Sequence, residues 1–355
     1  MTRPCDGHNL LYSGARVKRR PTIAIIGPGR VGGAIAVLAA RAGWPVSAVG
    51  GRNVRRARAA ARAVGPRVAA VTPQEAAGLA DVVLLTVPDD AIEAVCRQLA
   101  AARAFRLGAV VAHCSGALAS DVLLSAKSSC GCRIASMHPL QTFPTAAAGV
   151  AAIPGTYFFI EGDPRAAAVL SRLARDIGGR AVPLRARAKA LYHATGILAS
   201  NYLVTLMDAA VELGRLAGID RRKLLRALEP LVRSTVDNVF ALGPAKALTG
   251  PIARGDVQTV RRHLAAIRRR NPPLAELYAV LGARTVELAR RKGTLRPAAA
   301  EELNEFLRKA DLESFALSTN PRFLAMIERS RARMESEGGI STEEMRRRLG
   351  LKPSK

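Results

Sequence analysis

Thr22-Ile-Ala-Ile-Ile-Gly-Pro-Gly-Arg-Val-Gly-Gly33 is the stretch that decides the fold of this chain. It begins with a short apolar run typical of a buried strand and leads into a helical pattern that stops at Gly43. The glycines between them have the spacing GxGxxG. The first permits a tight turn, the second lets the backbone approach a pyrophosphate, and the third lets helix and strand pack closely. The stretch predicts a dinucleotide-binding βαβ unit, whose cofactor contacts come from Gly27, Pro28, Gly29, Arg30, Val31 and Gly32.

Strands and helices continue to alternate up to about residue 185. Apolar, β-rich runs predict further strands at 46–49, 81–87, 109–112, 133–137, 157–160 and 181–184, with helices at 53–64 and 164–177 among them. Alternating strands and helices form βαβ units with right-handed crossovers. The first half of the chain is therefore predicted to be α/β, a Rossmann domain over residues 21–185 with a mostly parallel sheet.

Only helical patterns follow Leu184. They cover 186 to about 217, and then about 221–241, 255–270 and 273–292. They predict an all-α domain, residues 186–295, that serves substrate binding and dimerisation. Residues 1–20 lack periodicity and are predicted to be a disordered basic leader. Residues 296–355 are predicted to be a charged helical appendage outside the core, with short helices at 298–309, 321–335 and 341–349.

The charge of the chain raises the question of a nucleic-acid partner. Lys and Arg number 54 against 28 Asp and Glu, which gives a formal net charge of +26. Residues 1–20 carry +4 and residues 296–355 carry +2, so most of the excess is spread through the folded middle. The basic residues are mostly arginines set among alanines, and aromatic residues, which would stack on bases, make up 4%. Composition therefore favours a genomic bias over a nucleic-acid-binding face.

Cysteine usage and apolar runs bear on location. Five cysteines and a start without an apolar signal region predict reduced thiols and a cytoplasmic protein. Cys130 and Cys132 have no second pair at zinc spacing, so no metal site is predicted. The apolar stretch around 194–206 is interrupted by Ser200 and Asn201, and it is shorter than the roughly 18–20 residues that span a bilayer. No membrane segment is therefore predicted.

The end of the second strand decides which nicotinamide cofactor is expected. An NAD site would carry an acidic residue there for the ribose 2′-hydroxyl, whereas this chain has Arg52 and Asn53, followed by Arg55 and Arg56. Cations in place of the acid favour a 2′-phosphate. We therefore predict NADP(H) as the cofactor, bound in part by Arg52 and Asn53.

The strand at 81–87 ends in Thr86-Val-Pro-Asp-Asp90. In an open parallel sheet the carboxyl ends of the strands line the ligand crevice. Val87 and Pro88 are therefore predicted to border a ribose of the cofactor, and Asp89 is predicted to cap the following helix.

Two polar loops follow the next strands, His113-Cys-Ser-Gly116 and Met137-His-Pro-Leu-Gln-Thr-Phe-Pro144. Both lie on the predicted ligand side of the sheet, so we expect them to line the substrate-binding site. We expect Ser115 and His138 to take part in catalysis, and Ser115, Gly116 and Gln141 to bind substrate.

The long helix after the domain boundary carries Lys189, His193, Ser200 and Asn201 in one stripe. Such polar groups are either satisfied core residues or the wall of a cleft between the two domains, and four together favour the cleft. Lys189 or His193 could donate a proton as hydride arrives at a carbonyl or imine. Asn201, which lies in the same stripe, is a further candidate catalytic residue.

A glycine- and proline-containing loop, Thr249-Gly-Pro-Ile-Ala-Arg-Gly-Asp256, is the fourth element. Arg254 could bind a substrate carboxylate bidentately, with Thr249 beside it. An Arg254–Asp256 pair at a helix start is the structural alternative.

With these elements the chain resembles the bacterial family that joins a Rossmann-like domain to domain of unknown function 2520. That family is grouped with the 6-phosphogluconate dehydrogenase-like oxidoreductases, near pyrroline-5-carboxylate and ketopantoate reductases. The resemblance covers about residues 21–292 and rests on Gly27–Gly32, His113–Gly116, His138–Phe143, Tyr192-His193, Ser200-Asn201 and Thr249–Asp256. It implies a helix Lys as the acid, followed four residues later by Asn. Because position 193 is His, Lys189 and His193 both remain candidate acids.

The leading hypothesis is an NADPH-dependent oxidoreductase that reduces a small anionic keto or imino acid, such as a ketopantoate-like 2-keto acid. The alternative is a non-catalytic NADP-binding regulatory or scaffold protein. The all-α half is expected to form a homodimer. Segments of residues 296–355, such as Asn320-Pro-Arg-Phe323, are similar to the ends of some antitoxin proteins, which suggests a protein partner for this tail.

Overall fold

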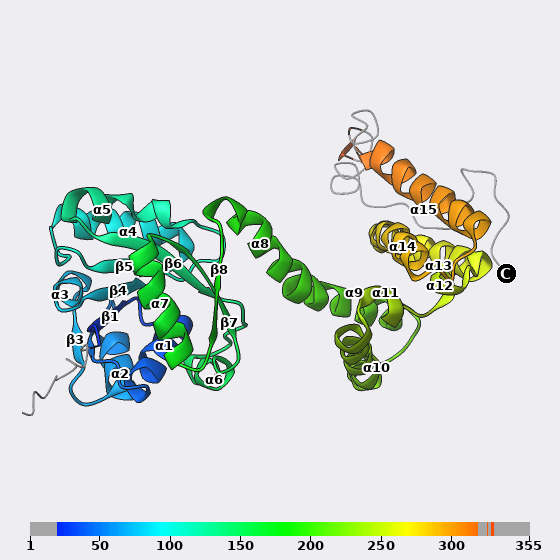
Figure 1. Cartoon of the computed structure of the whole chain (residues 1–355). Coiled ribbons are helices and arrows are strands. Elements are labelled where there is room, and N and C mark those ends of the chain that lie inside the picture. The colour runs from blue at the N-terminus through cyan, green and yellow to red at the C-terminus, as the bar shows by residue number, and fades with distance from the viewer. Residues whose placement is uncertain (1–19, 319–324, 326–327, 330–355) are drawn as a thin grey trace, which may run out of the picture. The chain divides into compact units, whose positions relative to one another are not determined.

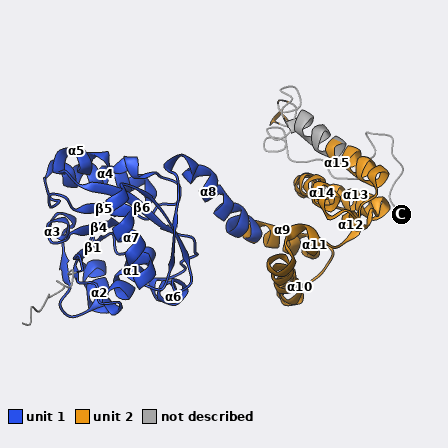
Figure 2. Cartoon of the chain, viewed as in Figure 1, with its two compact units in different colours: residues 1–203 blue, residues 204–355 orange. Residues whose placement is uncertain are grey.

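The structure is a computed structural model that describes residues 20–318, 325 and 328–329 (Figure 1). The chain divides into two compact units, Met1–Leu203 and Val204–Lys355 (Figure 2). The predicted leader, apart from Arg20, and the predicted helices at 321–335 and 341–349, apart from three residues, lie outside the described residues.

The first unit is built on one sheet of eight strands in the order β3-β2-β1-β4-β5-β6-β7-β8. All neighbouring strands run parallel except β6 and β7, which are antiparallel. The predicted fold, a Rossmann domain with a mostly parallel sheet followed by a helical part, is confirmed. The strands are β1 Ile23–Ile26, β2 Val46–Gly50, β3 Ala69–Val71, β4 Val82–Leu85, β5 Val110–His113, β6 Arg133–Pro139, β7 Tyr157–Gly162 and β8 Arg180–Pro183.

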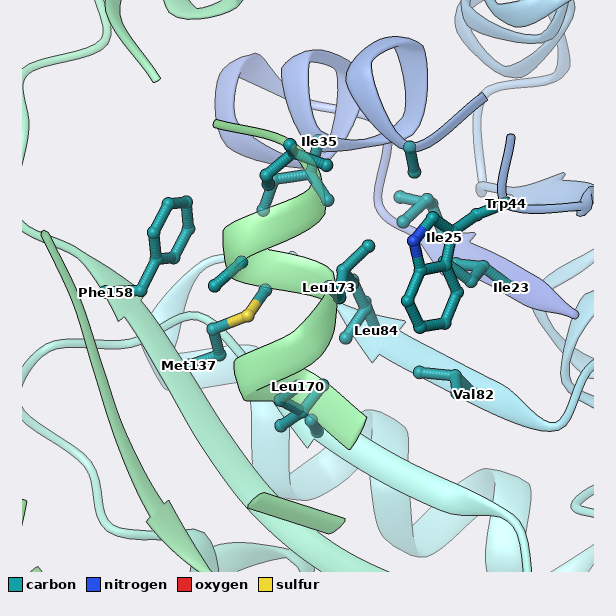
Figure 3. Packing of buried hydrophobic residues seen from close by; sticks show 14 of the residues in the cluster. Ile23, Ile25, Ile35, Trp44, Val82, Leu84, Met137, Phe158, Leu170 and Leu173 are labelled. Carbon is teal, nitrogen blue, oxygen red and sulfur yellow. The ribbon is translucent and has the colours of Figure 1, made fainter. Parts of the chain in front are cut away.

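Helices cover both faces of this sheet, so its strands are apolar on both sides. In β1, Ile23 and Ile25 belong to one core cluster, and the alternating Ala24 and Ile26 belong to another. The first cluster is closed by α1, α6 and α7, and Figure 3 shows two leucines of α7 among the strand side chains. The helices are α1 Arg30–Arg41, α2 Val54–Val64, α3 Pro73–Gly78, α4 Asp89–Ala101, α5 Leu124–Cys130, α6 Ala146–Ala152 and α7 Pro164–Asp176.

The strand–loop–helix unit at Gly27 has the glycine requirements that the sequence predicts. Gly27 has φ +87°, a conformation that side chains disfavour. A Cβ on Gly32 would collide with the side chain of Thr86, so this glycine permits the close packing of α1 on the sheet. The hydroxyl of Thr86 in turn donates to the carbonyl of Gly27 at 2.7 Å, which fixes the loop.

The long helix predicted from 186 is present as a continuous helical run with a change of pitch. A 3₁₀ turn, Ala186–Ala188, leads into α8 Lys189–Gly196, a π-helical segment Ile197–Asn201 and α9 Tyr202–Leu216. The first unit includes α8 and the π-helical segment, whereas the sequence suggested a boundary near 185. The physical reason is that Lys189 of α8 is hydrogen-bonded to the end of the sheet.

The helix Ala186–Leu216 as a whole is long and apolar enough to cross a membrane, by length and composition alone. The apolar stretch 194–206 is only a part of this longer helix. It is the one such helix among the described residues, and 6% of its apolar window is buried inside the protein. It is weak evidence for a membrane.

The second unit is helical, with a core of its own between α12, α13, α14 and α15. The sequence placed residues 296–355 outside the core, which is wrong for α15, because Ala300, Leu303 and Leu307 are fully buried in it. By contrast, α10 has no buried residue. The remaining helices are α10 Arg221–Leu242, α11 Pro244–Ala247, α12 Pro251–Arg254, α13 Val257–Arg270, α14 Pro272–Lys292 and α15 Pro297–Ser318.

Candidate functional site

A cavity of about 360 Å³ lies at the carboxyl ends of β1, β2 and β4. It brings together most of the residues predicted to bind the cofactor: Gly27, Pro28, Gly29, Arg52, Asn53, Val87 and Pro88. Arg30, Val31 and Gly32, which complete the predicted set, do not line it. Gly32 is buried against Thr86, and Arg30 is exposed, with its guanidinium 3.5 Å from the carbonyl oxygen of Phe143.

The loop of this cavity fits a dinucleotide phosphate. A Cβ on Gly29 would meet only the carbonyl oxygen of Gly27, at 3.9 Å, so the space in front of it is open. The helix α1 begins at the next residue, Arg30, and backbone N–H groups at a helix N-terminus attract phosphate. A nicotinamide dinucleotide can therefore approach the backbone here, and when bound it would supply the hydride.

The cavity is basic next to the end of β2. Arg52 and Arg56 line it, both exposed, and no acidic side chain of the described residues does. The amide oxygen of Asn53 accepts from the backbone N–H of Arg56 at 3.0 Å, so Asn53 serves as the N-cap of α2. This cap fixes the first turn of the helix, on which Arg56 lies.

A second cavity, of about 410 Å³, lies between the end of β6 and the helical segment that follows α8. It brings together four of the predicted residues, His138, Gln141, His193 and Asn201. Its wall includes the π-helical segment, a geometry frequent at functional sites. The other lining residues are Leu140, Thr142, Thr195, Gly196, Ile197, Ala199 and Ser200.

The side chains of Tyr192 and His193 meet at His138. The hydroxyl of Tyr192 lies 2.7 Å from its Nδ1, and the ring of His193 stands edge-on to it with 6.0 Å between centroids. Gly116 packs against both histidines, because a Cβ there would lie 2.5 Å from Cδ2 of His193 and 2.8 Å from Nε2 of His138. Burial and the nearby charge of Lys189 lower the pKa of His138 to about 4, so the imidazole is neutral near pH 7.

Ser115 lies close to this cluster but lines neither cavity. It is buried, and its hydroxyl donates to Oδ2 of Asp89 at 2.6 Å while accepting from the backbone of Ala117 and Leu118. Its hydroxyl is therefore engaged in holding its own loop. The expectation that Asp89 caps its helix is wrong, because Pro88 is the N-cap and Asp89 instead accepts from Ser115.

Lys189 is 2% exposed and also lies outside the cavity lining. Its ammonium donates to the carbonyl of Ser115 at 2.9 Å and to Oγ of Ser136 at 2.6 Å, and it lies 3.8 Å from Oε1 of Glu161. Burial lowers its pKa, and the carboxylate of Glu161 opposes that effect. This location argues against direct proton donation from Lys189 to a ligand in the cavity.

Thr249 and Arg254 belong to the second unit. Arg254 is exposed at the end of α12, and Asp256 caps α13 by accepting from the backbone N–H of Thr259 at 3.0 Å. Arg254 also contributes, after Thr259 and Arg262, to lowering the pKa of Asp256, so charge does couple the predicted pair. The carboxylate-binding role of Thr249 and Arg254 stays a prediction.

The sequence did not predict the roles of four participants of these clusters: Ser136, Glu161, Asp89 as a partner of Ser115, and Tyr192, which was named only among the motifs of the family resemblance. Tyr192 had a usable signal, since it lies three residues after Lys189 and therefore on the same helix face. Ser136 and Glu161 had none, because each lies in an apolar strand and pairs only through the antiparallel register of β6 and β7. Among the described residues no three metal-binding side chains gather.

Two family models match the chain, a Rossmann-like domain over residues 9–139 and domain of unknown function 2520 over residues 156–285. None of the curated proteins matches it. Three solved structures show the same fold.

Protein TM1727 from Thermotoga maritima is 26% identical, covers 76% of this chain and 99% of its own, and has a TM-score of 0.62. BF3122 from Bacteroides fragilis, provisionally named an NADP oxidoreductase, is 22% identical, covers 77% of this chain and 98% of its own, and has a TM-score of 0.60. The imine reductase from Pseudomonas sp. is 16% identical, covers 82% of this chain and 99% of its own, and has a TM-score of 0.52. The chain therefore belongs to the family in which a Rossmann-like domain is followed by domain of unknown function 2520.

Proposed function

We propose that the protein is an NADPH-dependent oxidoreductase that reduces a small keto or imino acid, with a ketopantoate-like 2-keto acid as the first substrate to test. The observation that carries the proposal is the pair of cavities in the first unit. One has the glycine loop and arginines of a dinucleotide site, and the other presents two histidines and two amides.

The preference for NADPH rests on Arg52 and Arg56. Both line the ribose end of the first cavity, where an NAD site would carry an acid. An arginine fork matches the geometry of a phosphate, whereas it gains little from a neutral 2′-hydroxyl. The name of the Bacteroides fragilis protein, which carries NADP, supports the same choice.

The reaction needs one hydride for the carbon of the C=O or C=N bond and one proton for its oxygen or nitrogen. His193 is the proposed proton donor, because it lines the second cavity beside His138. His138, neutral near pH 7, would hydrogen-bond the same oxygen or nitrogen through Nε2. Gln141 and Asn201 supply amide groups to orient the substrate.

The test is NADPH oxidation by purified protein over a panel of small keto and imino acids. We expect turnover with at least one of them, and a loss of turnover with unchanged NADPH affinity in His193→Gln. Arg133→Gln, which changes a half-buried residue at the start of β6 that lines neither cavity, is the matched control. NADPH binding without turnover on any member of the panel would favour the regulatory alternative.

We further propose a homodimer, formed through α10. Leu225 and Phe240 lie on one side of this helix and Leu231 and Leu242 on another, and all four are exposed. A helix that is apolar on more than one side is normally enclosed. A second copy of the chain is the proposed partner, since a two-fold contact would cover the same helix in both copies.

Light scattering on the eluting protein tests the dimer. We expect a dimer for the wild type and a monomer for Phe240→Asp. Leu107→Asp, at an equally exposed leucine of the first unit, should remain dimeric. A monomeric wild type at micromolar concentration would contradict the proposal. We also propose a cytoplasmic location, since the cytoplasm supplies the NADPH that the proposed reaction consumes.

A further inference from the structure

A buried network of polar side chains lies beneath the second cavity, and the proposed proton transfer does not use it. At its centre is the carboxylate of Glu161, which is 4% exposed. Oε1 accepts from the backbone N–H of Ser120 at 2.8 Å and from the hydroxyl of Ser136 at 2.7 Å, and Oε2 accepts from the hydroxyl of Ser120 at 2.9 Å. Ser136 in turn accepts from the ammonium of Lys189.

The network therefore joins elements that are far apart in the sequence. Ser136 belongs to β6, Glu161 to β7 and Lys189 to α8, and Ser120 begins the 3₁₀ turn Ser120–Leu123. A buried charge is costly unless it is paired and hydrogen-bonded, and here each partner meets that need for the other. The network therefore holds the start of α8 against the sheet, through Lys189.

What Lys189 holds is the histidine cluster. Lys189, Tyr192 and His193 are spaced i, i+3 and i+4, so they share one face of α8. The ammonium also holds the carbonyl of Ser115, the residue before Gly116, and Gly116 packs against both His138 and His193. One cation thus sets the position of the helix and of the loop that meet at His138.

We propose that Lys189 is a positioning residue, whose buried ammonium, paired with Glu161 and Ser136, fixes α8 and the Ser115–Gly116 loop so that Tyr192 and His193 meet His138. This rests on the proposed function for its consequence in catalysis, but not for its geometry. The ammonium makes two hydrogen bonds, and the carboxylate of Glu161, with Oε1 3.8 Å from Nζ, pairs with its charge.

The test reads the histidines directly, because the chain has five of them and their ring nitrogens can be resolved by ¹⁵N NMR without any substrate. The variant Tyr192→Phe serves as the reference: it gives the chemical shift of Nδ1 of His138 when that nitrogen has lost its hydroxyl partner. In Lys189→Met we expect the Nδ1 resonance of His138 to move to that position. Ser136→Ala, which keeps the charge of Lys189 and removes the two hydrogen bonds of this hydroxyl, one to Glu161 and one from Lys189, should move it part of the way.

Lys127→Met, at an exposed lysine of α5, is the matched control and should leave the resonance unchanged. NADPH affinity should also be unchanged, since Lys189 does not line the first cavity. A wild-type resonance in folded Lys189→Met would overturn the proposal. If that variant does not fold, a wild-type resonance in Ser136→Ala would overturn it instead.

Kinetics separate a positioning lysine from an acid. With a substrate in hand, Lys189→Met should lower kcat by about 100-fold, as misplacement by about 1 Å does. Every pH-dependent limb of the wild type should be retained, with the limb of His138 moved to higher pH because the charge of Lys189 no longer lowers its pKa. A variant that loses a pH-dependent limb of the wild type would identify Lys189 as the acid and overturn the proposal. Absence of turnover in the wild type would refute the proposed function alone, because the NMR result stands without it.

Discussion

The hydroxyl of Tyr192 lies 2.7 Å from Nδ1 of His138, and it joins α8 to the end of β6. If the hydroxyl donates, the proton of the neutral imidazole sits on Nε2, the nitrogen that faces Gly116. The contact therefore sets both the orientation and the tautomer of His138. Burial raises the pKa of Tyr192, so the phenol stays protonated and able to donate.

Tyr192→Phe removes this donor and leaves the ring in place. We expect turnover to fall by about tenfold, since removing a hydrogen bond to a buried group costs about 1–3 kcal/mol. NADPH affinity should not change. Steady-state kinetics and calorimetry measure the two effects. Tyr157→Phe, at an exposed tyrosine of β7, is the control, and equal activities of the two variants would contradict the role of Tyr192.

Gly116→Ala tests whether the loop must approach the histidines closely. The added Cβ would lie 2.5 Å from His193 and 2.8 Å from His138, so the two rings would be pushed apart. We expect a fall in turnover of about 100-fold with the fold and NADPH binding retained. Gly65→Ala, where nothing lies within 4 Å of the added Cβ, should be active. Full activity of Gly116→Ala would show that this contact is dispensable.

The stability of the first unit should depend on pH through His113. This residue is fully buried, its Nδ1 accepts from the backbone N–H of Ser115, and burial lowers its pKa from 6.5 to about 4. Between these values the unfolded chain binds a proton that the folded protein does not. The unfolding free energy should therefore be unaffected above about pH 6.5 and fall, by up to about 3 kcal/mol from this residue, as pH drops to 4.

Urea unfolding followed by the fluorescence of Trp44 measures this effect, because the chain's one tryptophan is buried in the first unit. His113→Gln should flatten the pH dependence by roughly half, since His138 also has a pKa lowered to about 4. His263→Gln, at an exposed histidine of the second unit, should keep it. A stability that rises on acidification would be the opposite of the expected sign.

The nucleotide cavity was largely predictable from sequence, whereas the histidine cluster was predictable only in part. Gly27, Gly29 and Gly32 act through a local strand–turn–helix geometry, and the positions of Arg52, Val87 and Pro88 follow from the rule that ligands bind at strand ends. The sequence also predicted four residues of the second cavity, because strand ends and a stripe on one helix are local features as well. These residues are His138, Gln141, His193 and Asn201.

The distinction between Lys189 and its neighbours could not be read from sequence. A polar stripe on a helix does not show which of its members meets a buried acid and which meets a cavity. That depends on Glu161, which faces Ser136 only because β7 runs antiparallel to β6. Asp89 was predicted to cap its helix, but it accepts a hydrogen bond from Ser115 instead. This role could not be predicted either, because it depends on a contact between residues 26 positions apart.

The measurement that tests the central claim most directly is calorimetric titration of the purified protein with NADPH and with NADH. NADPH should bind at least about tenfold more tightly, because hydrogen bonds to a charged group contribute about 1.5–3 kcal/mol. Arg52→Ala should remove most of that preference, and Arg58→Ala, at an exposed arginine of the same helical region that does not line the cavity, should retain it. Equal affinities for the two nucleotides, or binding of neither, would contradict the account.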